Sequence, residues 1–398
     1  MPWNEVTRVE SRKLFVVEAA QGDLARLCRE FGISRKTGYK WLERYRIEGD
    51  RGLCDRSRRP HHGVGATPAN VEEALVALRQ MHPYWGARKL CWLLRRRGMQ
   101  PPPERTANRI LQRHGLVDER RGREEVLRRF ERSHPNALWQ LDHKRAIHGA
   151  WAARTVPLVV EDDHSRYLVG LRAQPDKGLD ATWSSLWAIF GELGLPEAIL
   201  NDNDHVFHGP SGPSQLEVRL MRLGIVPLHG RTYHPQTQGK VERLQGTLER
   251  ELLHDGHFTS AEQLQAGFDR FREEYNYERP HEALGMEVPA SRYRPSARQR
   301  PKQLPPMEYP SGVTLRAAQK DGFISWKGWR IEVGTGLCGE RVEIRDTANG
   351  IEVHYGPYRL LGATLTGRRR THGEPALMTI STGEPSLRAT PLAPAPPC

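Results

Sequence analysis

The sequence lacks the features that mark zinc fingers, disulfide-stabilised secreted domains and membrane proteins. Its five cysteines form no CxxC pair and stand apart from any paired-histidine motif, so they predict neither a zinc finger nor a disulfide framework. No stretch approaches the roughly 20 apolar residues of a membrane-spanning helix. The opening segment MPWNEVTRVESRKLF has no apolar stretch like that of a signal peptide, and no GxxxxGK[ST] motif for ATP is present. We therefore expect a reducing, cytoplasmic setting.

Positive charge is concentrated in the first third of the chain. The 398 residues include 60 Lys and Arg and 48 Asp and Glu, which gives a net charge of +12. Residues 1–133 contain 29 Lys and Arg against 17 Asp and Glu, whereas residues 134–398 contain 31 of each. A basic segment before a neutral body is typical of a polyanion-binding arm, although a merely basic soluble domain gives the same balance.

A helix-turn-helix domain is predicted over residues 1–60. In GDLARLCREFGISRKTGYKWLERYR, apolar residues recur at helical spacing before Gly32, and Ser34 can cap the helix that follows. The candidate DNA contacts on this second helix are Arg35, Lys36, Lys40 and Arg44. The pattern favours a second helix that enters a DNA major groove; an ordinary helical hairpin is the alternative.

A second helical module with a basic linker is predicted over residues 61–130. The linker DRGLCDRSRRPHHGVGATP, at residues 50–68, has clustered Arg, Gly and Pro and no apolar period, so it either tracks phosphates or is simply solvated. The runs NVEEALVALRQM, WGARKLCWLLRRRG and ERTANRILQRHGL predict three helices separated by Pro and Gly. Such a module either binds DNA or is a plain packed bundle.

An α/β core is predicted over residues 131–300. Short strand-like runs such as ALWQLDHKRA, TVPLVVEDD and RYLVGLRAQ are combined with helical runs such as DATWSSLWAIFGELG. Beyond the core, alternating runs around Asn349-Gly350 predict hairpins and a small all-β barrel over residues 301–375. Residues 376–398 read as a disordered tail. The expected fold is therefore multidomain, with N-terminal all-α modules, a central α/β core and a C-terminal β-barrel.

Three carboxylates lie at predicted strand ends or at a helix start, where α/β domains carry their active-site residues. Asp142 in WQLDHK and Asp202 in AILNDND each lie at the end of a predicted strand, and Glu242 lies in the first turn of the helix that begins KVER. A helix-start carboxylate can simply complement the helix dipole, and a lone Asp after a strand is usually a turn residue. Together, however, the three carboxylates can hold Mg²⁺, and two such ions can activate a hydroxyl and stabilise the leaving oxygen of a phosphodiester.

The sequence around these carboxylates resembles the DDE transposases, which have a retroviral-integrase-type, RNase H-like core. It resembles most the bacterial insertion-sequence transposases with an N-terminal helix-turn-helix domain. The matching pieces are WQLDHK, EDDHSRYLVG, LNDNDHVF, HPQTQGKVERLQGTL and YNYERPHEALG, and the resemblance extends over about residues 11–360. It implies that Asp142, Asp202 and Glu242 form the catalytic and metal-binding triad, with two Mg²⁺ ions that Mn²⁺ can replace. It also implies that Gln238 and Lys240 lie near the DNA end.

The sequence departs from the family pattern at two places. Asn203-Asp204 stands where the family usually has Asn-Gly, and Asp adopts positive φ less readily than Gly. Asp204 is thus a rival carboxylate, but Asp202 keeps the strand-end position in ILND. The interval of 40 residues from Asp202 to Glu242 is slightly longer than usual, which a loop insertion at HGPSGPS can explain.

The resemblance implies a mobile-element transposase of the bacterial nucleoid. It would bind terminal inverted repeats, hydrolyse DNA at the element ends and join the freed 3′-OH to target DNA. Its partners would be double-stranded DNA and further copies of itself in a synaptic complex. Two alternatives remain open, an inactive relic that represses its own ends and a subunit that depends on a separate ATPase.

Overall fold

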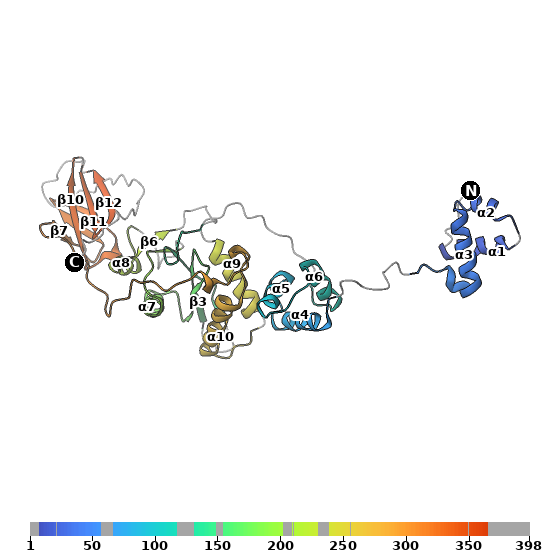
Figure 1. Ribbon diagram of the computed structural model, residues 1–398. Coiled ribbons are helices and arrows are strands. Elements are labelled where there is room, and N and C mark those ends of the chain that lie inside the picture. Colours follow the sequence, from blue (N-terminus) through green and yellow to red (C-terminus); the bar gives the residue numbers. More distant parts are fainter. Residues whose placement is uncertain are drawn as a thin grey trace. The chain divides into compact units, whose positions relative to one another are not determined.

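The computed structural model describes residues 8–20, 22–56, 67–117, 131–148, 154–201, 209, 211–229, 239–254, 256–348 and 350–364 (Figure 1). The chain divides into two compact units, Met1–Thr67 and Pro68–Cys398. None of the described helices is both long enough and apolar enough to cross a membrane.

The first unit is a small helical domain. Its elements are α1 (Arg8–Ala19), α2 (Leu24–Glu30), α3 (Arg35–Glu48) and the 3₁₀ helix η1 (Gly49–Leu53). Asp23 caps α2, Gly32 turns the chain with a φ of 62°, and the Ser34 side chain accepts from the Thr37 amide at 3.1 Å to start α3. Leu27, Cys28 and Trp41 lie in its core. The predicted helix, glycine turn and capped helix are therefore present in the structure.

The second unit begins with a three-helix module that has its own core. Its helices are α4 (Ala69–Met81), α5 (Ala87–Arg96) and α6 (Glu104–Arg113), as the sequence predicted. Leu75, Leu90, Leu94 and Leu111 are almost fully buried between them. The predicted domain limits, 1–60, 61–130, 131–300, 301–375 and 376–398, stay predictions, and residues 376–398 lie outside the described part of the chain.

The centre of the second unit is a mixed β-sheet. Its strands are β1 (Trp139–His143), β2 (Ile147–His148), β3 (Arg154–Asp162), β4 (Leu168–Gln174), β5 (Ala198–Asn201) and β6 (Val226–His229). The order is β2-β3-β1-β5-β6, and β3 also pairs with β4, which lies outside this linear order. The pairs of β3 with β1 and with β4 are antiparallel, whereas β5 is parallel to both β1 and β6. This is the mixed α/β sheet that an RNase H-like core requires.

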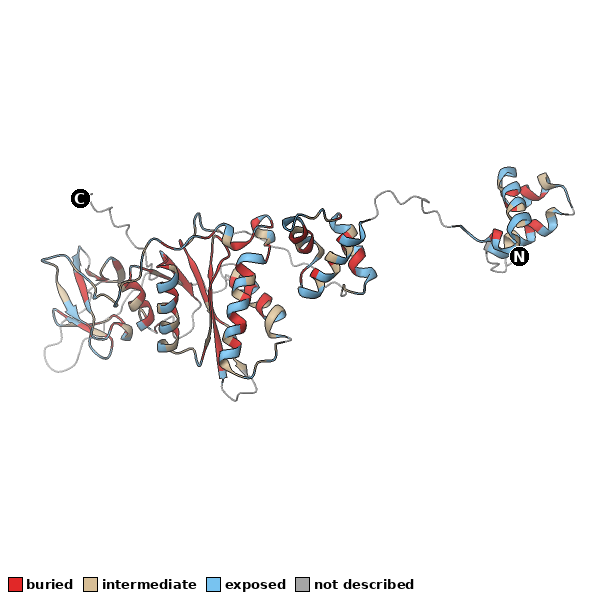
Figure 2. Ribbon diagram, turned by 60° about the horizontal axis from the view of Figure 1, so that its bottom comes forward, coloured by how far each residue is buried: buried red, intermediate tan, exposed pale blue. Residues whose placement is uncertain are grey.

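Helices cover both faces of this sheet, as Figures 1 and 2 show. They are α7 (Leu179–Leu193), α8 (Gln215–Arg222), α9 (Gly239–Leu248) and α10 (Ala261–Glu273). Trp139, Leu141 and Val160 pack against α7 and α8, while Val159 and Leu168 pack against α9 and α10. Helix α9 continues into the π-helical turn η3 (Glu249–Leu253), and α10 continues into η4 (Glu274–Glu278). Two 3₁₀ turns follow, η5 (Glu282–Leu284) and η6 (Pro289–Ser291).

The C-terminal region is an antiparallel sheet rather than the predicted barrel. Its elements are β7 (Leu315–Ala317), β8 (Phe323–Trp326), β9 (Trp329–Glu332), η7 (Thr335–Leu337), β10 (Arg341–Thr347), β11 (Gly350–Tyr355) and β12 (Tyr358–Thr364). Four strands pair in the order β12-β11-β10-β7 and β8 pairs with β9, and the strands within the described ranges do not close on themselves. The predicted hairpin at Gly350 is present between β10 and β11.

Helix α8 provides the physical reason for the open sheet. Val218 and Met221 of α8 belong to the apolar cluster of the C-terminal sheet, whereas Leu216 and Leu220 of the same helix belong to the central core. The guanidinium of Arg222 also reaches Glu340 at 3.2 Å. The apolar face of the four-stranded sheet is therefore covered by Ile324, Trp326 and Ile331 of the β8–β9 pair together with this helix of the core, and burying it does not require the strands to form a barrel.

Candidate active site

Asp142 lies at the end of β1 on the sheet face that α9 covers. Side chains alternate along a strand, so Trp139 and Leu141 point toward α7 while Gln140 and Asp142 point to the other face. Asp142 is half-buried, whereas the other residues of β1 are buried. Its Oδ2 accepts a hydrogen bond from Nε2 of Gln245 on α9 at 2.8 Å. This contact brings the strand-end carboxylate directly under α9.

Glu242 lies in the first turn of α9 and is exposed. The helix forms here because Val241, Leu244 and Leu248 recur at helical spacing, and all three are buried. Glu242 and Gln245 are three residues apart, so they are neighbours on the helix surface. Because Gln245 contacts Asp142, this spacing turns Glu242 toward the same edge of the sheet. The structure thus places two of the three predicted carboxylates on contacting elements.

Asp202, the third predicted carboxylate, lies outside the described residues, as do Asn203 and Asp204. The strand before it is described. β5 ends at Asn201 and runs parallel to β1, with Ile199 opposite Trp139 and Leu200 opposite Gln140. Within the described ranges no three His, Cys, Asp or Glu side chains come together as a metal site.

The predicted DNA contacts differ in exposure. Arg35, Lys36 and Lys40 are exposed on α3, and Arg44 is half-buried with its guanidinium 5.3 Å from the centre of the Trp41 ring. Gln238 lies outside the described residues. The ammonium of Lys240 donates to Oδ1 of Asp163 at 2.6 Å and to the Asp163 carbonyl at 2.9 Å. That ammonium is therefore held inside the protein.

The sequence did not reveal the roles of Gln245 and Asp163. A spacing of three from Glu242 is a signal for Gln245, but its partner is 103 residues away along the chain. Asp162 and Asp163 both lie where β3 turns toward β4, yet only the side chain of Asp162 closes the turn, by accepting from the Ser165 amide at 2.8 Å. Asp163 is fully buried and instead contacts Lys240 and Gln140.

Burial shifts the pKa values of the groups under α9. It raises the pKa of Glu161 to about 7, although Arg166 and Lys240 act in the opposite direction. Burial also lowers the pKa of Lys240, and Arg166 lowers it further, whereas Asp163 opposes the shift. Gln140 Oε1 and Glu161 Oε2 are buried and accept no hydrogen bond within the described part of the chain. The groups beneath the start of α9 are therefore polar and buried.

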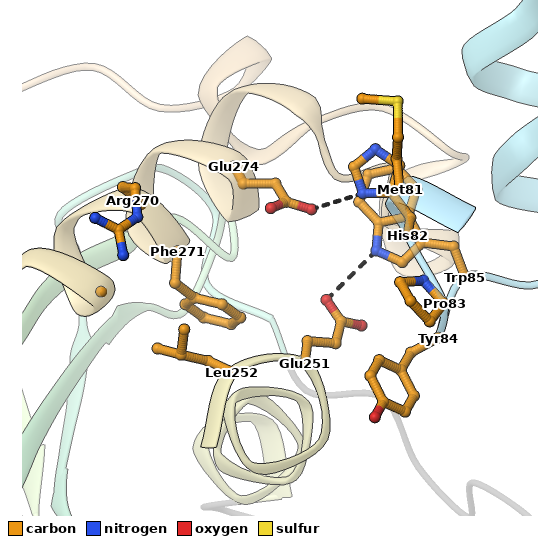
Figure 3. A pocket seen from close by; sticks show the side chains of 11 residues that line it. Met81, His82, Pro83, Tyr84, Trp85, Glu251, Leu252, Arg270, Phe271 and Glu274 are labelled. Atoms are coloured by element: carbon orange, nitrogen blue, oxygen red, sulfur yellow. Dashed lines mark hydrogen bonds and ion pairs between the residues drawn. The ribbon is translucent and has the colours of Figure 1, made fainter. Parts of the chain in front are cut away.

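A pocket of about 230 Å³ lies elsewhere, between the segment that follows α4 and the helices η3, α10 and η4. Figure 3 shows Glu274 directed at His82 and Glu251 directed at Trp85. The distances are 2.9 Å from Glu274 Oε1 to His82 Nδ1 and 3.4 Å from Glu251 Oε2 to Trp85 Nε1. Neither Asp142 nor Glu242 lines this pocket, so it marks packing of the three-helix module on the core and not the carboxylate site.

Comparison with known proteins identifies the parts of the chain. Residues 223–289, which include Glu242, Gln245 and the start of α9, match the family described as integrase core domain. Residues 12–61 match a helix-turn-helix domain, and residues 37–111 match a homeodomain-like domain.

Solved structures that match include retroviral integrases. The catalytic core of HTLV-2 integrase in complex with magnesium matches with 18% identity and a TM-score of 0.32, over 40% of this chain and 97% of that chain. The catalytic core of BIV integrase matches with 21% identity and a TM-score of 0.31, over 39% of this chain and 92% of that chain. A chain of the simian T-cell lymphotropic virus intasome in complex with PP2A regulatory subunit B56 gamma matches with 14% identity and a TM-score of 0.35, over 74% and 100%. From its sequence matches, the chain carries an integrase core domain behind N-terminal helix-turn-helix and homeodomain-like domains.

Proposed function

We propose that this protein is the DNA transposase of an insertion-sequence-type mobile element. It binds the terminal inverted repeats, hydrolyses DNA at the element ends and joins the 3′ ends to target DNA. The observation that carries this proposal is the integrase core match around Glu242, on a helix whose Gln245 contacts Asp142 at 2.8 Å. The excess positive charge in residues 1–133 supplies the attraction for DNA that such a reaction needs.

The proposed catalytic residues fit a magnesium site by their chemistry. Asp142 and Glu242 are carboxylates on contacting elements, and Asp202 directly follows β5, the parallel neighbour of β1. Carboxylate oxygens are the ligands that Mg²⁺ prefers, and Mn²⁺ accepts the same set. Held there, two such ions would supply activation of the attacking hydroxyl and stabilisation of the leaving oxygen. Gln245 contributes by holding one oxygen of Asp142 in a fixed direction.

Two helices are proposed to contact the element ends. In the first unit, Arg35, Lys36, Lys40 and Arg44 of α3 face DNA. In the three-helix module, α6 buries Ile110 and Leu111 and exposes Arg105, Arg109 and Gln112. Residues 105, 109 and 112 share one helix face, and Arg and Gln are side chains that read base edges. The module is therefore proposed as a second DNA-binding module.

The DNA end itself is proposed to lie near Gln238 and Lys240, at the start of α9. Because Asp163 already binds the Lys240 ammonium, Lys240 acts there mainly through the helix start that it holds in place. Two ends must be brought together, so we propose that several copies of the chain form a synaptic complex at the bacterial nucleoid. A separate ATPase is a further proposed partner, because ATP use would need another protein.

Strand transfer in vitro tests the proposal. Duplexes from the edges of the native locus would be incubated with a target plasmid and wild-type protein or Glu242→Gln, with Mg²⁺, Mn²⁺ or EDTA. We expect joining that requires both the metal and Glu242, with unchanged binding to the duplex. Glu308→Gln, at an exposed carboxylate outside the integrase match, is the matched control and should join normally.

Two results would contradict the proposal. Joining by Glu242→Gln at the wild-type rate would remove Glu242 from the triad. Tight binding to the ends without joining under any metal would favour the relic repressor or the ATPase-dependent subunit. Addition of a neighbouring ATPase, if the locus encodes one, would then separate these two.

A further inference from the structure

A single buried carboxylate links the two described elements that bear proposed catalytic residues. Asp163 is fully buried, and its Oδ1 accepts from Gln140 Nε2 at 2.7 Å and from Lys240 Nζ at 2.6 Å. Its Oδ2 accepts from the backbone amide of Arg132 at 2.7 Å. The donors come from β1, from α9 and from the segment that enters the core. Asp163 therefore joins three parts of the chain that are far apart in sequence.

The turn between β3 and β4 does not need Asp163. Asp162 accepts from the Ser165 amide, from the Ser165 hydroxyl at 2.5 Å and from the Asn136 amide at 2.7 Å. These bonds satisfy the turn and fix its start. Within the described part of the chain, the side chain of Asp163 bonds to Arg132, Gln140 and Lys240 and not to the turn, so a turn role does not explain why a carboxylate is buried there.

The two side-chain donors stand in matching positions relative to the proposed catalytic carboxylates. Gln140 lies two residues before Asp142 on β1, and Lys240 lies two residues before Glu242 on α9. In a strand, a spacing of two places side chains on the same face, so Gln140 and Asp142 both lie under α9. On α9, a shift of the first turn would move Glu242 together with Lys240.

Glu242 also has a tether on its other side. Gln245, one turn further along α9, donates to Asp142 at 2.8 Å. Lys240 thus binds Asp163 in the turn after β3, and Gln245 binds Asp142 on β1. Along α9, these two contacts lie on either side of Glu242. The first tether is an ion pair whose side chains are 12% and 0% exposed, so water screens it little.

We propose that Asp163 is a positioning residue, which fixes the first turn of α9 through Lys240 and so sets the place of Glu242 relative to Asp142. This inference rests on the proposed metal site at Glu242. A misplacement of about 1 Å in a reacting group costs about 100-fold in rate, so loss of this tether should be visible in metal binding and in strand transfer.

The test compares wild type with Asp163→Asn in the full chain. Asn keeps the size of the side chain, and its one oxygen can still accept from Gln140. It removes the charge that holds Lys240 and the second oxygen, which accepts from the Arg132 amide. Asp269→Asn, at an exposed Asp that accepts from Gln265 on α10, is the matched control. Mn²⁺ binding is measured from the electron paramagnetic resonance of free Mn²⁺. Hydrogen exchange is followed at the amides of residues 239–248, and the rate of strand transfer is measured separately.

We expect Asp163→Asn to exchange faster at the start of α9, to bind Mn²⁺ at least 5-fold more weakly and to join DNA about 100-fold more slowly. Its affinity for the duplex should stay within 2-fold of wild type. The proposal would be overturned if Asp163→Asn melted at a lower temperature but, while folded, bound Mn²⁺ and exchanged its amides like wild type. Asp163 would then be purely structural.

A second variant covers the case in which Asp163→Asn does not fold. The pair Asp163→Asn with Lys240→Met removes both charges of the ion pair, so neither is left buried without the other. Recovery of folding without recovery of Mn²⁺ binding supports the positioning role, whereas recovery of both overturns it. If wild type joins no DNA, the proposed function fails, yet exchange and Mn²⁺ binding still decide the role of Asp163.

Discussion

Removal of two exposed lysines from α3 should flatten the salt dependence of DNA-end binding by a calculable amount. Lys36 and Lys40 are both exposed on the proposed reading helix. Each phosphate that a cation neutralises contributes about 0.9 to the slope of log K against log salt, so Lys36→Ala with Lys40→Ala should reduce the slope by about 1.8. Between about 50 and about 200 mM salt, wild-type affinity should then fall about 12-fold more than that of the double variant.

The cations of both Lys40 and Arg44 lie over the Trp41 ring, at 4.6 and 5.3 Å from its centre, but Arg44 should behave differently because it is half-buried whereas Lys40 is exposed. Arg44→Ala should destabilise the first unit by about 0.5–1 kcal/mol, with a smaller change of slope than either lysine gives. Fluorescence anisotropy of a labelled end duplex over a salt series measures the slopes, and thermal unfolding measures the stability.

Lys13 provides the control, since it is an exposed cation of α1 whose ammonium pairs with Asp50 at 2.8 Å. Lys13→Ala should leave the slope almost unchanged. A folded double variant with the wild-type slope would refute α3 as the phosphate-binding helix. Recognition would then move to residues 70–116, where Arg105→Ala with Arg109→Ala would be the next pair to measure.

Three further predictions concern the core. Gln245→Ala removes a hydrogen bond to a charged group, worth about 1.5–3 kcal/mol, and single-turnover strand transfer should slow about 10- to 100-fold with unchanged duplex binding. Glu161 has a folded-state pKa of about 7, raised by burial, so its ionisation penalises folding increasingly between about pH 4.5 and 7 and by a constant amount above. Urea unfolding should therefore give Glu161→Gln a free energy of unfolding about 3 kcal/mol above that of wild type at pH 8 and almost the same value at pH 4.5. An equal difference at both pH values would disprove the raised pKa. Asp204→Gly should keep or raise strand transfer if Asp202 is the ligand, and a dead variant would assign that role to Asp204.

Local signals in the sequence predicted the elements that local interactions determine. The glycine turn and the Ser34 cap of α3 involve residues close in sequence, and both occur as expected. The alternating pattern of WQLDHK likewise gave β1 with Asp142 at its end. Such elements are readable because capping and periodicity need no knowledge of the rest of the chain.

The predicted barrel failed because closure is a tertiary property. Alternation in residues 315–364 correctly indicates strands, but it does not say what covers their apolar face. Val218 and Met221 supply part of that cover from α8, about 100 residues earlier in the chain, and the β8–β9 pair supplies the rest. Their sequence pattern is that of an ordinary amphipathic helix, and nothing in it distinguishes one buried side from two.

The polar contacts behind the proposed site were out of reach of sequence reasoning for a related reason. Asp163 and Lys240 are 77 residues apart, and no sequence motif around either residue indicates that they are in contact. Lys240 was expected near DNA because the resemblance implies it, and a lysine expected at a DNA end gives no reason to expect an internal ion pair.

The buried ion pair at the start of α9 restricts the position of the helix more than apolar packing does. Leu244 and Leu248 already bury one side of α9, and apolar packing alone tolerates small slides and rotations of a helix. A buried ion pair contributes little net stability, because desolvation of both charges offsets their attraction, but it accepts few geometries. Lys240 bound to Asp163 and Gln245 bound to Asp142 restrict α9 in directions that leucines do not. If Glu242 must meet Asp142 around shared metal ions, that restriction is the property the site requires, and hydrogen exchange at the start of α9 is where its loss should first be seen.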